Sequence, residues 1–261
     1  MDKQFPRQYH ARDTASLGHL VLNDYETGYP AALLEASQIR AARTAASAVL
    51  AAEILHAERS AERLAVIGAG IIGRNILEFF AAAQWHIGDL IIYDKVAGYA
   101  AAMSNFARTQ LDYPGRVGPS LSGALSGADL VVLATTAAAP YLSDPGAFRP
   151  GEVVLNISLR DIAPVIIAGA SIVLDDIEHC LNAGTSPHLA VERFGHRDFI
   201  TGTLAQVMTG GVSTDPATSV IFSPFGLGVL DLAVGSFVYR EAFRSGEAVD
   251  IPDFFGATSR W

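Results

Sequence analysis

Three glycines and one distant aspartate form the pattern in this sequence that most clearly implies chemistry. Gly68, Gly70 and Gly73 have the spacing G-x-G-x-x-G directly after a short apolar run, and Asp94 follows a second apolar run about twenty residues further on. The first glycine allows a tight turn out of a strand, the second lets the backbone approach a pyrophosphate, and the third lets a helix pack against the sheet. The pattern predicts a dinucleotide site. The alternative is a glycine-rich turn in a βαβ unit that binds nothing.

The residues around these glycines also indicate which dinucleotide is bound. A helix is expected to follow them, and its unpaired N–H groups and positive dipole end would face the phosphates. Ile71 and Ile72 lie within the motif and are expected to contact the cofactor together with the glycines. The Asp94 carboxylate can accept hydrogen bonds from both hydroxyls of the adenosine ribose, and it would repel a 2′-phosphate. The sequence therefore favours NAD over NADP.

Further polar side chains stand at the ends of apolar runs. Asp161 follows the run at residues 153–157, and Thr135 and Thr136 come at the end of the run at residues 130–134. Open α/β sheets bind their ligands outside the carboxyl ends of the strands, so we expect these side chains near the cofactor. The threonines are expected beside its ribose or nicotinamide, with ordinary strand-end threonines as the alternative. For Asp161 the alternatives are a solvated loop residue and a helix cap.

Short apolar runs alternate with helical stretches over most of the chain, which is typical of a doubly wound parallel sheet. The runs cover residues 64–68, 90–93, 130–134, 153–157 and 171–174, and the helix after the glycines is expected over residues 75–84. We therefore predict an α/β fold with a Rossmann-type NAD-binding domain over residues 61–225.

A smaller part precedes this domain. The expected elements are strands over residues 18–22 and 31–34 joined by a hairpin turn, a helix over 37–55 capped by Ser37, and a final helix over 225–243. Residues 1–60 are predicted to form a partial α+β substrate and dimerisation domain, against which the C-terminal helix of residues 226–261 packs. The boundary between the two domains is expected near residues 57–63.

The two N-terminal strands have a consequence for assembly. Two strands bury little apolar surface by themselves, so either the subunit borrows structure from a partner or the chain lacks an N-terminal segment. We expect an oligomer, and a two-fold homodimer is the commonest form.

Composition excludes several other partners. The chain has 261 residues and a net charge of −9, and it has no run of lysine or arginine, which argues against nucleic acids and anionic membranes. No apolar run approaches the roughly 18 residues of a membrane span. Cys180 is the only cysteine, so no disulfide can form within the chain, and this fits the reducing cytoplasm.

Read together, several segments resemble the ornithine cyclodeaminase/mu-crystallin family. They are D-x-x-T-G-x-P at residues 24–30, A-R-T-A-A-S at residues 42–47, the glycine motif, Asp161, and the helix at residues 226–243. The resemblance is closest to the branch that makes 2,3-diaminopropionate for siderophores and peptide antibiotics. The segments that mark this branch are residues 156–164, 175–179, 185–189 and 223–231.

The resemblance implies roles for individual residues. Arg43 would grip the substrate carboxylate with its guanidinium fork beside the nicotinamide, where the alternative is a surface arginine in an ordinary ion pair. Asp161 would be the catalytic carboxylate, which moves protons during the reaction. Thr44, Ser158 and Leu159 would line the cofactor. Lys3 is the candidate counterpart of a lysine that is important in relatives.

The resemblance also implies a reaction. A hydride would leave the α-carbon of an N-linked glutamate–diaminopropionate conjugate for NAD⁺, water would add to the iminium, and 2,3-diaminopropionate and 2-oxoglutarate would be released. One alternative is an ornithine cyclodeaminase or a ketimine/imine reductase that runs in the reverse direction. Cyclodeaminases carry a lysine where this chain has Val165, and the diaminopropionate branch usually has a glutamate there, so this position departs from both patterns. Another alternative is a catalytically idle, crystallin-like module that only binds NAD.

Overall fold

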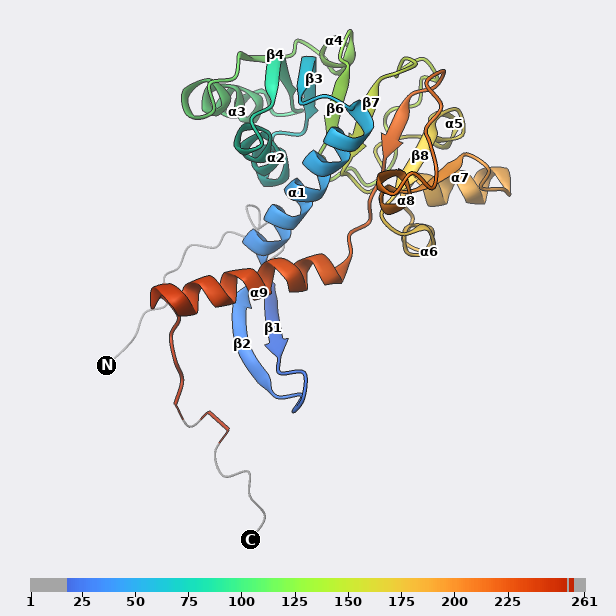
Figure 1. The fold of residues 1–261 in the computed structure, drawn as a ribbon. Coiled ribbons are helices and arrows are strands. Elements are labelled where there is room, and N and C mark those ends of the chain that lie inside the picture. The colour runs from blue at the N-terminus through green and yellow to red at the C-terminus, as the bar shows by residue number, and fades with distance from the viewer. Residues whose placement is uncertain (1–17, 253, 256–261) are drawn as a thin grey trace. The chain divides into compact units, whose positions relative to one another are not determined.

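The computed structural model describes residues 18–252 and 254–255, and Figure 1 shows its elements, most of them labelled. The strands are β1 His19–Asn23, β2 Pro30–Glu35, β3 Ser60–Ile67, β4 His86–Tyr93, β5 Gly115–Val117, β6 Leu130–Leu133, β7 Val153–Asn156, β8 Ser171–Leu174, β9 Ile200–Thr203 and β10 Val220–Phe222. The helices are α1 Ala36–His56, α2 Ile71–Ala82, α3 Ala97–Gln110, α4 Leu121–Leu125, α5 Pro164–Ile167, α6 Ile177–Cys180, α7 Ser186–Phe194, α8 Leu204–Met208 and α9 Gly228–Ser245. In the described ranges, no helix combines the length and apolar character needed to cross a bilayer.

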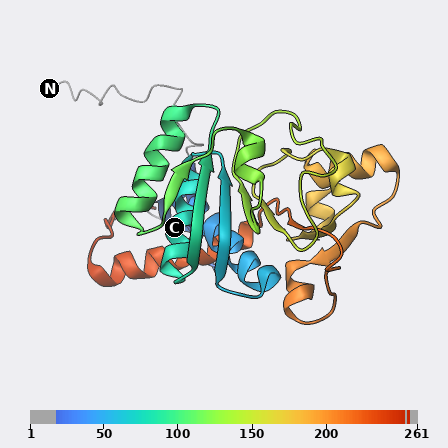
Figure 2. The same ribbon diagram turned by 90° about the horizontal axis from the view of Figure 1, so that it is seen from above.

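Eight of the described strands form one parallel sheet in the order β5-β4-β3-β6-β7-β10-β8-β9. From β3 the chain adds β4 and β5 on one side, and it then returns to add β6 and β7 on the other, so the order reverses between β3 and β6. Open sheets bind their ligands at such a reversal, outside the carboxyl ends of the strands. Figure 2 shows the strands side by side with helices packed around them. The predicted α/β fold with a doubly wound parallel sheet is confirmed.

Two hydrophobic cores fix this sheet, one on each face. Successive side chains of a strand point to opposite faces, so Val66 of β3 joins one core and Ile67 joins the other. The first core packs α1, α2 and α3 on the sheet, with Phe80 of α2 fully buried. The second packs α4, α5 and α7. The loops at the carboxyl ends of β3, β6 and β7 therefore extend from a rigid layer.

Some elements differ from the expectation. The short strands β5, β9 and β10 were not predicted, and β10 is inserted between β7 and β8. The helix α2 begins directly after Gly70 rather than at residue 75, because Gly70 is its N-cap. Ser37 does not cap α1. Instead, the Glu35 carboxylate accepts the backbone N–H groups of Ser37 and Gln38 at 2.7 and 3.1 Å.

The chain divides into two compact units, which consist of residues 1–40 with 228–261, as far as these are described, and of residues 41–227. In the first unit β1 and β2 form an antiparallel hairpin, and α9 contacts both strands. A Cβ at Gly235 of α9 would collide with Leu20 of β1, so the glycine permits close packing. The C-terminal helix thus packs on the N-terminal strands in this unit. The unit boundary falls inside α1, and the domain boundary near residues 57–63 stays a prediction.

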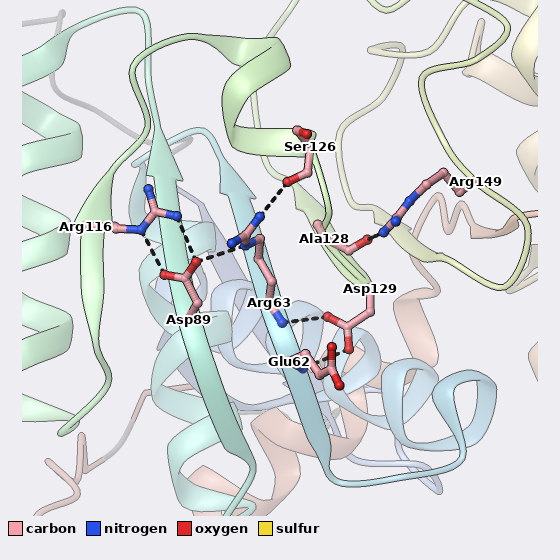
Figure 3. Close-up of polar contacts among 8 residues, drawn as sticks. All are labelled: Glu62, Arg63, Asp89, Arg116, Ser126, Ala128, Asp129 and Arg149. Atoms are coloured by element: carbon pink, nitrogen blue, oxygen red, sulfur yellow. Dashed lines mark hydrogen bonds and ion pairs between the residues drawn. The ribbon is translucent and has the colours of Figure 1, made fainter.

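Charged side chains connect three strands at the amino-terminal end of the sheet (Figure 3). Asp89 of β4 accepts hydrogen bonds from Nε of Arg63 on β3 and from Nε of Arg116 on β5, both at 2.9 Å. Arg63 also donates to the carbonyl oxygen of Ser126 at 2.9 Å. The hydrogen bond from Arg116 lowers the pKa of Asp89 below its ordinary value, against the opposing effect of burial. The ionised carboxylate holds these strands at the end opposite the predicted site.

Asp129, next to the start of β6, holds the adjacent end of β3 in the same view. Its carboxylate accepts the backbone N–H groups of Glu62 and Arg63 at 2.9 and 2.8 Å. Nε2 of His56 lies 3.4 Å from Oδ2 of Asp129. Burial alone would raise the pKa of Asp129. Hydrogen bonds from His56, Arg63 and Glu62 outweigh burial and lower the pKa to about 2.

We expect Asp129→Asn to destabilise the fold at neutral pH and to matter less in acid. A carboxyl group with a lowered folded-state pKa stabilises the protein above its ordinary value of 3.8, and this contribution is lost as the pH falls toward 2. The shift corresponds to about 2 kcal/mol. Denaturant unfolding between pH 7 and pH 3 measures the difference in free energy, with the exposed Asp198→Asn as control. If the difference in free energy of unfolding between the parent protein and Asp129→Asn stays constant over this pH range, the ionic contribution of Asp129 is contradicted.

Candidate dinucleotide and catalytic site

The turn after β3 requires glycine at two positions. Gly68 has φ +100°, and its N–H donates to the Tyr93 carbonyl oxygen at 2.8 Å. A Cβ on Gly68 would lie 2.5 Å from the carbonyl oxygen of Ala134, and a Cβ on Gly73 would lie 2.7 Å from the carbonyl oxygen of Gly68. Any side chain here would push apart β3, β6 and α2, so the motif has the tight geometry expected of a dinucleotide-binding turn.

Gly70, in contrast, faces open space. A Cβ on Gly70 would meet no atom within 4 Å, and no side chain caps the N-terminus of α2. The unpaired N–H groups in the first turn of a helix attract phosphate oxygens. Ile71 is 38% exposed and Ile72 is half-buried. This cradle fits the pyrophosphate of a dinucleotide, because the backbone is both unobstructed and uncapped.

Asp94 lies beside the glycine turn, as the sequence predicts. Its two carboxylate oxygens accept the backbone N–H groups of Ala69 and Val96, each at 2.8 Å, and the residue is half-buried. Each oxygen retains a second lone pair, so the carboxylate can also accept two ribose hydroxyls. Its role as a ribose ligand stays a prediction.

A buried carboxylate lies where the chain leaves β6 and β7. Asp161 has 0% exposure, and its oxygens lie 2.8 and 2.9 Å from the donating hydroxyl of Thr135. The Tyr141 hydroxyl donates to Oδ2 at 2.9 Å. Burial, with the negative charge of Asp161 beside it, raises the pKa of Tyr141 above its ordinary value, so the phenol remains a donor. Two hydroxyls thus hold the carboxylate in one orientation.

The backbone around Asp161 is also fixed. The N–H groups of Tyr141 and Leu142 both donate to its carbonyl oxygen at 3.1 Å, and Leu142 pairs with Ile162. The N-cap of α5 is Ala163, which makes no side-chain cap. Asp161 is therefore neither a helix cap nor a solvated loop residue, and both structural alternatives for it are wrong.

The other predicted cofactor residues differ in their burial and contacts. The hydroxyl of the buried Ser158 accepts the backbone N–H of Thr135 at 2.7 Å, so the hydroxyls of Ser158 and Thr135 both have protein partners. Thr136 and Leu159 are exposed, and Thr44 of α1 is half-buried. Their contacts with a cofactor stay predictions. Lys3 lies outside the described residues.

Arg43 of α1 lies against the loop that follows β10. Gly226 has φ +106°, and a Cβ there would lie 2.6 Å from Nη1 of Arg43. Asp175, directly after β8, accepts the backbone N–H groups of Phe225 and Gly226 at 3.1 and 2.6 Å. The carboxylate fixes the turn that the guanidinium contacts. This turn also explains why α9 begins at Gly228 rather than at residue 225.

Asp175 does not cap the helix that follows it. Asp176 alone is the N-cap of α6, and it accepts the backbone N–H of His179 at 2.7 Å. The Cys180 thiol donates to Asp175 at 3.1 Å, and burial, together with this carboxylate, raises the pKa of Cys180 to about 12. Among the described residues, no group of three or more His, Cys, Asp or Glu side chains could hold a metal ion.

Sequence reasoning missed two positions that shape the site, Tyr141 and Asp175. Tyr141 contacts Asp161 from a loop twenty residues away along the chain, and Asp175 contacts Gly226 across 51 residues. Neither pair shares an element or a periodic pattern, so no local signal in one sequence identifies them.

Known proteins with similar sequences and folds cover most of this chain. N-((2S)-2-amino-2-carboxyethyl)-L-glutamate dehydrogenase from Staphylococcus aureus is 29% identical over 235 residues, which cover 86% of this chain and 68% of that enzyme. Delta(1)-pyrroline-2-carboxylate reductase from Bacillus thuringiensis is 29% identical over 244 residues, which cover 88% of this chain and 72% of the reductase. The structure of the iminosuccinate reductase of Paracoccus denitrificans in complex with NAD⁺ superposes with a TM-score of 0.76 at 25% identity. The superposition covers 90% of this chain and 74% of the reductase chain.

The family resemblance seen in the short motifs extends over almost the whole sequence. The sequence profile of the ornithine cyclodeaminase/mu-crystallin family matches residues 6–246, from the segment before the hairpin to the end of α9. A match of this length includes the glycine turn, Arg43 and Asp161 in one alignment. The chain belongs to the ornithine cyclodeaminase/mu-crystallin family.

Proposed function

We propose that this protein oxidises the C–N bond of an N-linked glutamate–diaminopropionate conjugate with NAD⁺, and releases 2,3-diaminopropionate and 2-oxoglutarate. It is an NAD-dependent oxidoreductase of amino acids, as its family membership and relatives indicate. One observation carries the proposed catalytic step: the buried Asp161 carboxylate lies at the same sheet edge as the uncapped glycine turn. The S. aureus relative, whose name contains this conjugate, supports the choice of substrate.

The glycine turn and Asp94 would hold the dinucleotide. The N–H groups around Gly70 would bind its pyrophosphate, and Asp94 would accept the adenosine ribose hydroxyls. When bound, NAD⁺ supplies the hydride acceptor, which is the redox chemistry of the reaction. The protein contributes the position of the substrate relative to this acceptor, which accounts for much of the rate in such reactions.

Asp161 would act on protons. Loss of hydride from the α-carbon of the glutamate part leaves an iminium group, and water adds to this carbon. The Asp161 carboxylate would accept one proton from the water and return it to the departing nitrogen. As the C–N bond breaks and the carbonyl of 2-oxoglutarate forms, the remaining hydroxyl proton would be released to solvent. Thr135 and Tyr141 direct the carboxylate by donating to it. Its acceptor atoms then keep one orientation through both proton transfers.

Arg43 would bind the carboxylate on the carbon that loses hydride. A guanidinium group can form two parallel hydrogen bonds with a carboxylate and so fix its orientation as well as its place. The turn at Phe225 and Gly226, which Asp175 holds, limits where this guanidinium can lie.

Two alternatives remain distinguishable by simple measurements. The similarity to pyrroline-carboxylate and iminosuccinate reductases favours imine reduction as the second candidate. An idle NAD-binding module would bind NAD but form no NADH with any amino acid. Absorbance of NADH, followed with the conjugate and NAD⁺ and then with cyclic imines and NADH, separates these three functions. Formation of NADH with the conjugate supports the proposal.

We also propose that the protein forms a homodimer and acts in the cytoplasm. The hairpin of β1 and β2 with α9 would complete a two-fold homodimer, because two strands bury little apolar surface without further cover. The single cysteine, buried as Cys180, is consistent with activity in the cytoplasm.

Asp94→Asn should weaken NAD binding and reduce the preference for NAD over NADP. The amide can still accept one backbone hydrogen bond, but it loses the charge that binds hydroxyls and repels a 2′-phosphate. Charge-assisted hydrogen bonds contribute about 1.5–3 kcal/mol, so the Kd for NAD should rise at least tenfold. Fluorescence titration with NADH and NADPH measures both affinities, with Asp198→Asn as control. An unchanged ratio of the two affinities contradicts the ribose assignment.

Asp161→Asn should lower turnover by about 10²–10⁴-fold, because the amide cannot accept a proton. The swap keeps the size of the side chain and an oxygen for the Thr135 hydroxyl, so folding and NADH affinity should stay near those of the parent protein. Initial rates and NADH titration give the two quantities. Turnover at the parental rate would make Asp161 a structural residue, and a selective loss of NADH affinity would make it a cofactor ligand instead.

A further inference from the structure

Among the residues that the structure describes, Arg160 has no partner that accounts for its charge. It precedes Asp161 in the loop after β7, and the residue is only partly exposed. Its Nε atom is buried and has no hydrogen-bond partner. Within the described ranges, no ion pair or other hydrogen bond of its guanidinium is found either. This cation is therefore partly removed from water without an anion beside it.

The described side chains around Arg160 form no ion pair with it. A partly buried charge is costly unless it is paired, yet the adjacent Asp161 directs its oxygens to Thr135 and Tyr141. On its other side, the guanidinium carbon lies 3.9 Å from where a Cβ on Gly184 would be. The turn at Gly184 leads into the N-terminus of α7, whose dipole end is itself positive. The site favours an added negative charge.

The first N–H groups of α7 are not free to bind that charge. The N–H of Ser186 donates to the Leu159 carbonyl oxygen at 3.0 Å, and the N–H of His188 donates to Oγ1 of Thr185 at 3.2 Å. An anion at this place would therefore take its hydrogen bonds from the guanidinium of Arg160.

Arg160 also shares one edge of the sheet with the proposed substrate anchor. Arg160 follows β7, whereas Arg43 lies against Gly226 in the loop after β10. The strands β7 and β10 are parallel neighbours, with Leu155 opposite Phe222, so their carboxyl ends meet at the same edge. The guanidinium of Arg160 therefore lies in one loop, and that of Arg43 lies against the neighbouring loop. Asp161 directly follows Arg160 in the sequence.

We propose that Arg160 binds a second carboxylate of the substrate and so selects amino acids with an additional acidic group. This inference rests on the proposed function and deepens it, since Arg43 would bind the first carboxylate. A guanidinium at this place also disfavours substrates with a cationic side chain, such as ornithine or lysine. Arg160 is thereby a specificity-determining residue that separates acidic conjugates from cyclic or basic amino acids.

Two keto acids that differ only in the second carboxylate test this directly. 2-Oxoglutarate and 2-oxovalerate have the same carbon chain, so their affinities for the NADH complex isolate the additional charge. Binding is measured by titration calorimetry, without turnover. The parent protein should bind 2-oxoglutarate about 10- to 100-fold more tightly, which corresponds to one charge-assisted interaction. Arg160→Gln should remove this preference, and Arg160→Lys should restore part of it.

Arg193→Gln is the matched control, because Arg193 is an exposed arginine on α7. It should keep the preference of the parent protein. Equal binding of both keto acids by the parent, or a preference that survives in Arg160→Gln while NADH binding is intact, overturns the role of Arg160 and leaves the proposed function standing. Failure of the parent protein to bind NADH overturns the proposed function, and the role of Arg160 falls with it. If Arg160→Gln does not fold, Arg160→Lys decides alone, because a partial loss is expected only from a direct carboxylate contact.

Discussion

A carboxylate without solvent exposure must be held by hydrogen-bond donors, and the site of this protein is organised by that requirement at Asp161. Its donors come from the loop after β6, where Thr135 and Tyr141 reach across to the loop after β7. Both loops must therefore leave their strands at the same level of the sheet. The parallel register, in which Leu133 pairs with Asn156, provides this. A shift of this register by one residue would separate the carboxylate from its donors.

The same sheet edge positions the cofactor cradle and the substrate anchor. The glycine turn follows β3, which neighbours β6, and the loop that contacts Arg43 follows β10, which neighbours β7. Packed cores on both faces hold these strands in place, so the loops start from fixed points. At the opposite end, Asp89 and Asp129 tie the strands together with charged hydrogen bonds. These charged hydrogen bonds lie at the end of the sheet opposite the proposed chemistry.

The sequence predicts the parts of this arrangement that have local signals. The glycine turn, the position of Asp94 beside it, the hairpin and the five apolar strands follow from spacing and periodicity, and the structure contains them. Short strands such as β10 have too few residues for a periodic pattern, so their insertion was missed. The hydrogen bond from Tyr141 to Asp161 and the one from Gly226 to Asp175 connect segments that are distant in the sequence. They depend on strand order, which a single sequence does not encode locally.

The direct transfer of hydride from substrate to cofactor is the central chemical claim, and isotope tracing tests it. The glutamate α-carbon of N-((2S)-2-amino-2-carboxyethyl)-L-glutamate is labelled with deuterium, and the conjugate is incubated with the protein and NAD⁺. Mass spectrometry then locates the label after a single turnover. The account predicts that the deuterium is found in the reduced cofactor, together with unlabelled 2-oxoglutarate. Deuterium in the solvent with no labelled NADH, or conjugate that remains intact while NAD⁺ is bound, would contradict it.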